Sequence, residues 1–330
     1  MLVLRRDMGV AGLWYLVLAP VGVYLAIAFG LILSQPAPEP PVGDGLDFGS
    51  IDADDGPDPG LIQSRGGQWL RHFSGPNPGR GPLVVVVHGS GWHGAGYLAL
   101  ARSLAQGAEV LLPDLRGHGP YPERRGDIDH IGQFEDDLAG LIVHYGGQER
   151  PVYMVGHSSG GGLVIRFAGG RHGHLLAKAA LIAPFVQHDA PTARASSDWA
   201  HVLLRRMIGL SMLNAVRIQF LNGLTAIQFK FPKAVLQGPL GHTATRAYSF
   251  RLNTSLAPRR NFRADIAKLP PYLVIVGSKD EAFRAEAYEP LFTAANPKGK
   301  FVLMQDVGHL DIVQNHDALA KIGQFLNAQA

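Results

Sequence analysis

Short apolar runs alternate with stretches of helical spacing along most of this 330-residue chain. Runs of four to six residues of this kind are typical of parallel strands that are covered on both faces. The predicted strands are 68–73, 83–87, 109–112, 152–155, 179–183, 272–276 and 301–304, and the predicted helices between and after them are 97–106, 131–145, 163–168 and 311–326. This order predicts an α/β fold with a doubly wound, mostly parallel sheet.

The alternation breaks in the segment 184–271. Apolar residues from Trp199 to Leu210 are spaced as on one face of a helix, and Ser196 or Ser197 would cap its N-terminus. We therefore expect a mainly helical cap inserted at about residues 186–265. Within it, residues 220–240 have no clear period.

An uncharged apolar stretch covers residues 8–33 and follows Arg5 and Arg6. As a helix it would be about 39 Å long, which exceeds a hydrocarbon core of about 30 Å. Segment 1–34 is therefore predicted to be a transmembrane signal anchor. The alternative is a cleaved secretory signal peptide, whose apolar region is usually shorter, at about 7–15 residues. Because basic residues precede the stretch, we expect a cytoplasmic N-terminus and a domain translocated to the periplasm or exterior, or secreted after cleavage.

Residues 35–60 differ in composition from both neighbouring segments. They are rich in Pro, Gly and Asp, with seven acidic residues and no Lys or Arg between Gln35 and Asp58. Such a composition favours a flexible acidic linker. The main α/β domain, cap included, is then residues 61–330.

Charge and cysteine content exclude several classes of function. The chain has no cysteine, so thiolate catalysis and cysteine metal sites are excluded. A net charge of +3, without a basic run interleaved with aromatics, gives no support for a nucleic-acid partner. Between residues 190 and 263, however, eleven Lys or Arg face the single acid Asp198. Three interpretations of this basic excess are open: it forms an ordinary solvated surface, it contacts anionic lipid headgroups, or it attracts an anionic substrate.

The strand predicted at 152–155 runs into the pattern G-x-S-x-G, formed by Gly156, Ser158 and Gly160. A serine on a tight strand-to-helix turn needs neighbours without side chains two positions away on either side. The turn would expose the Ser158 hydroxyl, and it would place the Ser159 N–H at a helix N-terminus, where an oxyanion is stabilised. A glycine-rich turn with an incidental serine is the alternative.

A serine hydroxyl needs a base, and the base needs a carboxylate that orients it. Asp280 follows the strand predicted at 272–276, and His309 follows the one at 301–304. Glu281 is the main rival to Asp280, whereas Asp306 and Asp311 lie too close to His309 in sequence to reach its Nδ1. His157, inside the turn, is expected to pack beside the site, and His88, His93 and His118 lack metal-ligand spacing, so no metal site is predicted.

The order of these motifs, together with His88-Gly89 after an early strand and Asp114-Leu115-Arg116-Gly117-His118-Gly119, resembles the α/β-hydrolase family from about Gln68 to the C-terminus. The resemblance implies Ser158 as nucleophile, His309 as general base and acid, and Asp280 as its orienting carboxylate. It also implies an oxyanion hole formed by the backbone N–H groups of Ser90 and Ser159. Gly91 is a weaker candidate than Ser90 for the donor from this loop.

The implied chemistry is hydrolysis of a carboxylic ester through an acyl-enzyme, without a cofactor. A serine at the elbow disfavours the dehalogenases and epoxide hydrolases of this fold, which place an aspartate there. The glycine-rich elbow and inserted cap look similar to the lysophospholipase-like esterases and lipases, which implies a small-molecule or lipid-like acyl ester as substrate. An acyltransferase or thioesterase with the same triad, or a non-catalytic binding protein, is the alternative.

Overall fold

An eight-stranded sheet forms the centre of the computed structural model, which describes residues 10–48, 58–64, 67–194 and 198–328. The strand order is β1-β2-β4-β3-β5-β6-β10-β11. β2 is antiparallel to both its neighbours, and the strands from β4 to β11 in this order are parallel. The predicted α/β fold with a mostly parallel sheet is therefore confirmed. The strand bounds are β1 (Ile62–Gln63), β2 (Trp69–Phe73), β3 (Leu83–Val87), β4 (Glu109–Pro113), β5 (Val152–His157), β6 (Lys178–Ile182), β10 (Tyr272–Gly277) and β11 (Gly299–Met304).

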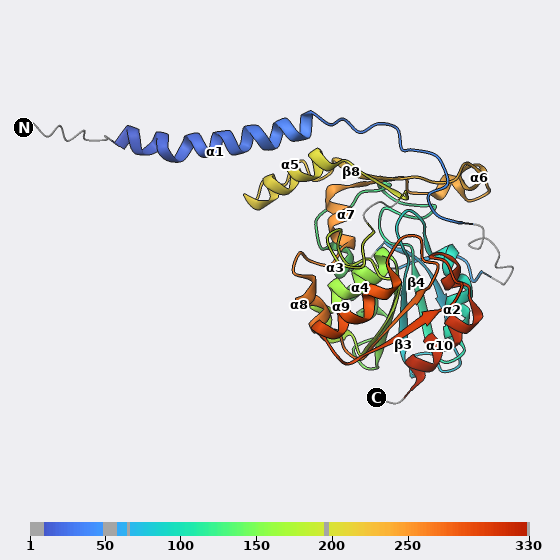
Figure 1. Cartoon of the computed structure of the whole chain (residues 1–330). Helices are drawn as coiled ribbons and strands as arrows, with labels where there is room; N and C mark the ends of the chain where they lie inside the picture. Colours follow the sequence, from blue (N-terminus) through green and yellow to red (C-terminus); the bar gives the residue numbers. More distant parts are fainter. Residues whose placement is uncertain (1–9, 49–57, 65–66, 195–197, 329–330) are drawn as a thin grey trace, which may run out of the picture.

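Helices cover both faces of this sheet (Figure 1). In β3, Val85 and Val87 belong to one hydrophobic core and Val84 and Val86 to the other, so every residue of the run is buried. This two-sided burial explains why the strands are uninterrupted apolar runs. The helices around the sheet are α2 (Leu98–Ala105) and α10 (His316–Asn327) on one face and α3 (Gln133–His144), α4 (Ser159–Gly169) and α9 (Tyr288–Ala295) on the other.

The segment expected to form a mainly helical cap also contains an antiparallel sheet of three strands, β7-β8-β9. Trp199 precedes β7, and the residues just after it form a strand rather than the start of a helix. The expected capping residues, Ser196 and Ser197, lie outside the described residues. The cap elements are β7 (Ala200–Val202), α5 (Leu204–Ala215), β8 (Thr225–Phe229), α6 (Lys233–Gln237), β9 (Ala247–Ser249) and α7 (Phe250–Leu256), followed by α8 (Phe262–Ala267).

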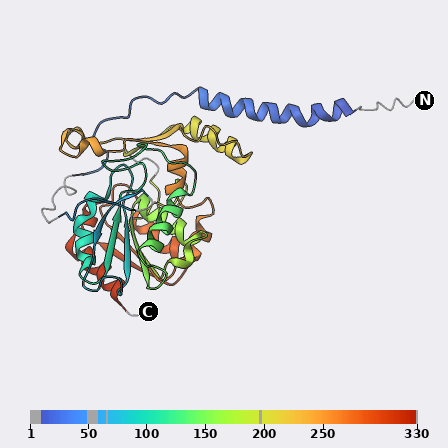
Figure 2. The same cartoon turned by 180° about the vertical axis from the view of Figure 1, so that it is seen from behind.

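Helix α1 (Val10–Leu33) lies along α5 at the top of the cap (Figures 1 and 2). Ala28 and Ile32 are buried against α5 and its neighbours, and the Tyr24 hydroxyl donates to the Met212 carbonyl at 2.9 Å. Within the described part of the chain, no helix is long and apolar enough to cross a membrane. The predicted transmembrane anchor is therefore not confirmed, and the C-terminal part of this helix packs against the cap.

The segment after α1 crosses the cap and then descends beside it (Figure 1). Val42 pairs with Phe231, and the Gly43 N–H donates to the Phe231 carbonyl at 3.0 Å. Leu46 and Phe48 are both only 7 % exposed. We call residues 42–48 the strap. Leu46 and Phe48 of the strap are buried against the cap, although Pro, Gly and Asp surround them in sequence. This burial corrects the prediction of a flexible linker for residues 42–48.

Candidate active site

Ser158 lies in the turn between β5 and α4, with a backbone φ of 54° and ψ of −122°. Such a conformation is strained for a residue with a side chain. The glycines on either side permit it. A Cβ on Gly156 would lie 2.5 Å from the Gly160 carbonyl oxygen, and a Cβ on Gly160 would lie 2.3 Å from that of Val87. The close approach of these backbones therefore requires glycine at both positions.

Asp280 and His309 meet at the carboxyl ends of β10 and β11. The His309 Nδ1–H donates to Asp280 Oδ2 at 2.8 Å, and both side chains are about 1 % exposed. The other carboxylate oxygen accepts the N–H groups of Ala282 and Phe283, at 2.9 and 2.7 Å. Burial by itself would raise the pKa of Asp280, but the charge and hydrogen bond of His309 and these two backbone donors outweigh burial and lower this pKa. Asp280 is thus held as a carboxylate that fixes the tautomer of His309.

The rival carboxylate Glu281 points to a different part of the same histidine. Its Oε2 accepts the backbone N–H of His309 at 3.0 Å, so it holds the loop and leaves the ring to Asp280. Asp311 accepts the N–H of Gly308, and Asp306 pairs with Lys279. Because Asp280 occupies Nδ1 of His309, Nε2 is the ring nitrogen that remains for Ser158. Ser158 and His309 line one cavity.

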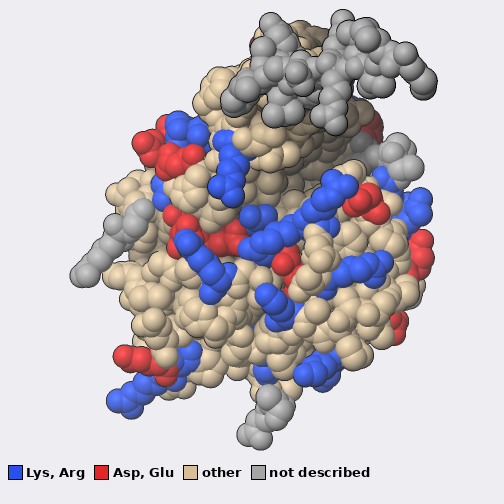
Figure 3. All heavy atoms as spheres, turned by 90° about the vertical axis from the view of Figure 1, so that its left-hand side faces the viewer, with Lys and Arg blue, Asp and Glu red and all other residues tan. Residues whose placement is uncertain are grey.

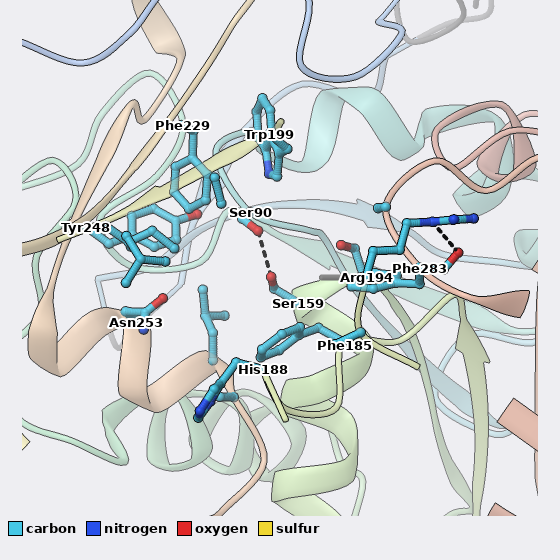
Figure 4. Close-up of a pocket in the computed structure, with 18 of the residues that line it drawn as sticks. Ser90, Ser159, Phe185, His188, Arg194, Trp199, Phe229, Tyr248, Asn253 and Phe283 are labelled. Carbon is cyan, nitrogen blue, oxygen red and sulfur yellow. Dashed lines mark hydrogen bonds between the residues drawn. The ribbon is translucent and has the colours of Figure 1, made fainter. Parts of the chain in front are cut away.

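The loop Gly89-Ser90-Gly91 follows β3 and lies beside the elbow. Two tyrosine hydroxyls accept its outer N–H groups: Tyr97 binds Gly89 N–H at 2.9 Å, and Tyr248 binds Gly91 N–H at 2.5 Å. The N–H of Ser90 between them has no hydrogen-bond partner among the described residues. Because Gly91 is already bound, Ser90 is the residue of this loop that can donate to an oxyanion. Its hydroxyl lies 2.6 Å from that of Ser159, as Figure 4 shows.

Buried neutral histidines connect these tyrosines to the rest of the site. The Tyr97 hydroxyl donates to His157 Nδ1, and the His157 Nε2–H donates to the His309 carbonyl at 2.9 Å. The Tyr248 hydroxyl donates to His118 Nε2 at 2.6 Å. Burial, more than any neighbouring charge, lowers the pKa of His157 to about 3 and that of His118 well below its ordinary value. Both rings are therefore neutral structural groups at physiological pH.

A cavity of about 410 Å³ lies between the elbow and the cap. Ser90 and Ser159 lie in the middle of the view, with the aromatic rings of the cap on one side and Phe185 and Phe283 on the other (Figure 4). A mostly apolar cavity of this size suits a small organic ligand. Its apolar lining residues are Phe185, Ala193, Trp199, Ala200, Val202, Ile227, Phe229, Tyr248, Leu256, Ala257, Ala282 and Phe283.

Sequence reasoning missed the two tyrosines and the strap. Tyr97 and Tyr248 are 151 positions apart and follow no motif, so only the fold brings their hydroxyls to one loop. Leu46 and Phe48 lie in a segment of disorder-like composition, where they form an apolar pair at i, i+2 spacing. That pair was the one signal that could have indicated packing.

Acidic residues outside segment 190–263 partly neutralise the basic excess of the cap. Arg251 pairs with Asp127, and Arg259 pairs with Glu135 at 2.6 Å and with Asp265 at 3.0 Å. On the face shown in Figure 3, Lys and Arg lie among Asp and Glu rather than in an unbroken patch. The charge distribution therefore favours an ordinary paired surface over a basic binding face there.

A parallel sheet with a serine elbow after its central strand, and a carboxylate and a histidine after two later strands, is the arrangement of the α/β hydrolases. Comparison with known families agrees: the model of the family described as "Serine aminopeptidase, S33" matches residues 80–310, more than half of the chain. The chain belongs to this family of α/β hydrolases.

Individual relatives include lipases. Human monoglyceride lipase is 30% identical over 142 residues, which are 41% of this chain and 45% of the lipase. The chain spans less than half the length of the curated relatives that it matches. Among solved structures, a monoacylglycerol lipase of Paleococcus ferrophilus is similar with a TM-score of 0.58 and 19% identity, covering 78% of this chain and 96% of the lipase. A membrane phospholipase A, described as a bacterial virulence factor, has a TM-score of 0.53 and 17% identity, covering 96% and 98%.

Proposed function

We propose that this protein is a serine esterase or lipase that hydrolyses hydrophobic carboxylic esters through an acyl-enzyme on Ser158. The observation that carries the proposal is the 2.8 Å contact between Asp280 and His309, in the same site as a serine on a strained turn. A carboxylate, an imidazole and an exposed hydroxyl in this order make an activated nucleophile.

The reaction begins when the Ser158 oxygen attacks the ester carbonyl while His309 Nε2 takes the hydroxyl proton. The N–H groups of Ser90 and Ser159 donate to the oxyanion of the tetrahedral intermediate, and the positive end of α4 adds to this stabilisation. When the intermediate collapses, the C–O bond to the alcohol breaks and His309 returns the proton to the leaving oxygen. Water then attacks the acyl-enzyme by the same steps in reverse and releases the free acid.

The apolar cavity supports a hydrophobic substrate. Aromatic and aliphatic side chains form most of its wall. Human monoglyceride lipase and the solved monoacylglycerol lipase are relatives whose names point to single-chain lipid esters. We therefore propose acyl esters with one hydrophobic chain, such as monoacylglycerols or lysophospholipids, as the substrate class.

We further propose that the enzyme attaches to a membrane through α1. Leu18, Val21, Val23 and Ile27 on this helix are at least half exposed, an apolar surface that lipid would cover. The membrane phospholipase A is similar over 96% of this chain. A cytoplasmic N-terminus with a translocated catalytic domain, or secretion after cleavage, stays a prediction from the sequence.

A fluorophosphonate probe tests the nucleophile. We expect it to label the wild-type protein covalently at Ser158, because an activated serine attacks phosphorus as it attacks an ester carbonyl. Failure to label the folded protein would rule out the enzyme and leave a binding protein on this fold. Supplying an ester together with an acceptor alcohol, and measuring free acid against transferred ester, distinguishes hydrolysis from acyl transfer.

Fractionation tests the attachment. We expect the full chain to sediment with membranes and the triple variant Leu18→Ser/Val21→Ser/Val23→Ser to move to the soluble fraction, since its changes leave the α1 residues that face α5 in place. Membrane binding that is unchanged in this variant contradicts a role for α1.

A further inference from the structure

The strap borders the catalytic residues themselves. Leu46 and Phe48 line a small void of about 20 Å³ whose other walls include Ser158 and His309. On the opposite side, the same two residues line an outer hollow of about 790 Å³, together with Asp44, Val235 and Glu281 among others. Two strap side chains thus form a partition between the reacting serine and a much larger space.

An aromatic cluster holds this partition in position. The ring of Phe48 lies 5.9 Å from that of Trp92, 5.6 Å from Trp199 and 5.1 Å from Phe231. The backbone also fits closely, because a Cβ on Gly45 would lie 2.7 Å from the Lys230 carbonyl oxygen. Aromatic pairs at these distances stabilise a structure beyond the effect of the area that they bury. The strap is therefore a fixed wall made jointly by the N-terminal segment, the loop after β3 and the cap.

The space around Ser158 is consequently unequal on its two sides. The cavity under the cap has about 410 Å³, whereas the void behind the strap has about 20 Å³, the room of about one water molecule. Trp199 lines both, as do Ser90, Ser158 and His309. An ester bound at Ser158 has two substituents, the acyl chain and the alcohol, that leave the carbonyl carbon in different directions. One of them has ample room and the other meets Leu46 and Phe48.

We propose that Leu46 and Phe48 determine specificity by restricting one side of the ester to a small group. The enzyme then accepts esters with one long and one short substituent and rejects esters that are long on both sides. This inference rests on the proposed esterase function and narrows it: among single-chain esters, those with the smallest second substituent are preferred.

Three esters test the restriction: methyl octanoate, octyl acetate and octyl octanoate. The measured quantity is kcat/KM for octyl octanoate divided by kcat/KM for the better of the other two. We expect a low ratio in the wild type and a rise of about tenfold or more in Leu46→Ala/Phe48→Ala, since a few methylenes of pocket space change discrimination by about that factor or more. The matched control is Val42→Ala, which removes an exposed strap side chain that does not line the void.

Folding is checked by near-ultraviolet circular dichroism. If the double variant loses its tertiary signal, Leu46→Ala and Phe48→Leu separately keep most of the aromatic cluster and should each raise the ratio by a smaller factor. A wild type that cleaves singly long esters, with a ratio that folded variants leave unchanged, overturns the role of the strap and keeps the esterase. A wild type that cleaves none of the three and is not labelled by the fluorophosphonate overturns the esterase, and the strap proposal with it.

Discussion

The sequence pattern predicts the secondary structure of the main α/β domain much better than that of the cap. In the main domain, strands buried on both faces are apolar throughout, and each predicted strand corresponds to an observed one. In the cap, Trp199 and α5 obtain their burial from distant segments: Phe48 of the strap packs against Trp199, and α1 covers α5. The difference teaches that a local pattern reports structure only where an element's burial partners are regular sheet and helix neighbours.

The site combines both regions. Ser158, Asp280 and His309 come from strand ends of the main domain, whereas Tyr248 and the apolar wall come from the cap. Catalytic groups of the main domain are thus expected to carry the largest effects, and cap groups are expected to tune them. The following experiments test this division, from the largest effect to the smallest.

Ser158→Ala removes the proposed nucleophile, which lies in the main domain. We expect ester hydrolysis to fall by about 10⁵–10⁶-fold in kcat, as loss of a triad serine does elsewhere, with unchanged stability. Steady-state kinetics and fluorophosphonate labelling measure both consequences. Labelling that persists at full rate in this variant would identify another nucleophile.

Asp280→Asn tests the choice between adjacent carboxylates. We expect kcat to fall by about 10⁴-fold, because an amide cannot hold the His309 tautomer that accepts the serine proton. Glu281→Gln is the matched control, since the Glu281 carboxylate binds the backbone N–H of His309 and not its ring, so kcat should fall by less than about tenfold. The reverse order of the two losses would make Glu281 the triad acid.

Tyr248→Phe tests whether the cap contributes to the chemical step. The variant leaves the Gly91 N–H buried without its acceptor, at a cost of about 1–3 kcal/mol, so the neighbouring Ser90 donor loses its position. We expect kcat to fall by about 10–100-fold with little change in KM. Tyr97→Phe removes the equivalent hydroxyl on the main-domain side, and a similar kcat loss in both variants would support a loop held from two sides. A change in KM alone for Tyr248→Phe would limit the cap to binding.

His157→Asn tests the acid sensitivity of the main domain. The folded pKa of His157 is about 3, below its ordinary value of about 6.5, so the unfolded chain binds a proton that the folded chain does not between these values. Its contribution to stability is therefore full above about pH 6.5 and decreases by about 1.4 kcal/mol per pH unit as pH falls. In urea unfolding at pH 7.5 and pH 5, the variant should lose less stability than the wild type. Equal losses would mean that His157 has the same protonation state in the folded and the unfolded chain.

Gly209→Ala tests the contact between α1 and the cap. A Cβ at this position would lie 2.5 Å from the Ala28 carbonyl oxygen, so α1 must move away from α5. We expect faster amide hydrogen exchange in residues 24–33, with the melting temperature of the main domain unchanged. Gly223→Ala is the control in the same cap, because a Cβ there would lie near the side-chain ends of Arg251 and Asp127 and away from α1. Unchanged exchange would show that α1 and α5 can separate slightly without loss of packing.

Much of the fold and the order of the site residues could be predicted because the causes are local. An apolar run such as 83–87 is a buried strand in almost any context, and Gly156 and Gly160 follow from the collisions that any side chain there would cause. The identity of the serine, the carboxylate and the histidine follows from their places after strands, since parallel strands bring their carboxyl ends to one edge of the sheet.

Only the tertiary structure decided which groups complete the site. Asp280 and Glu281 are neighbours in sequence, and the direction of each side chain toward His309 depends on the loops after β10 and β11. Tyr248 reaches Gly91, and Phe48 reaches the void beside Ser158, across long stretches of chain. Contacts of this kind leave no periodic pattern, because a single hydroxyl or ring placed by the fold is enough to make them.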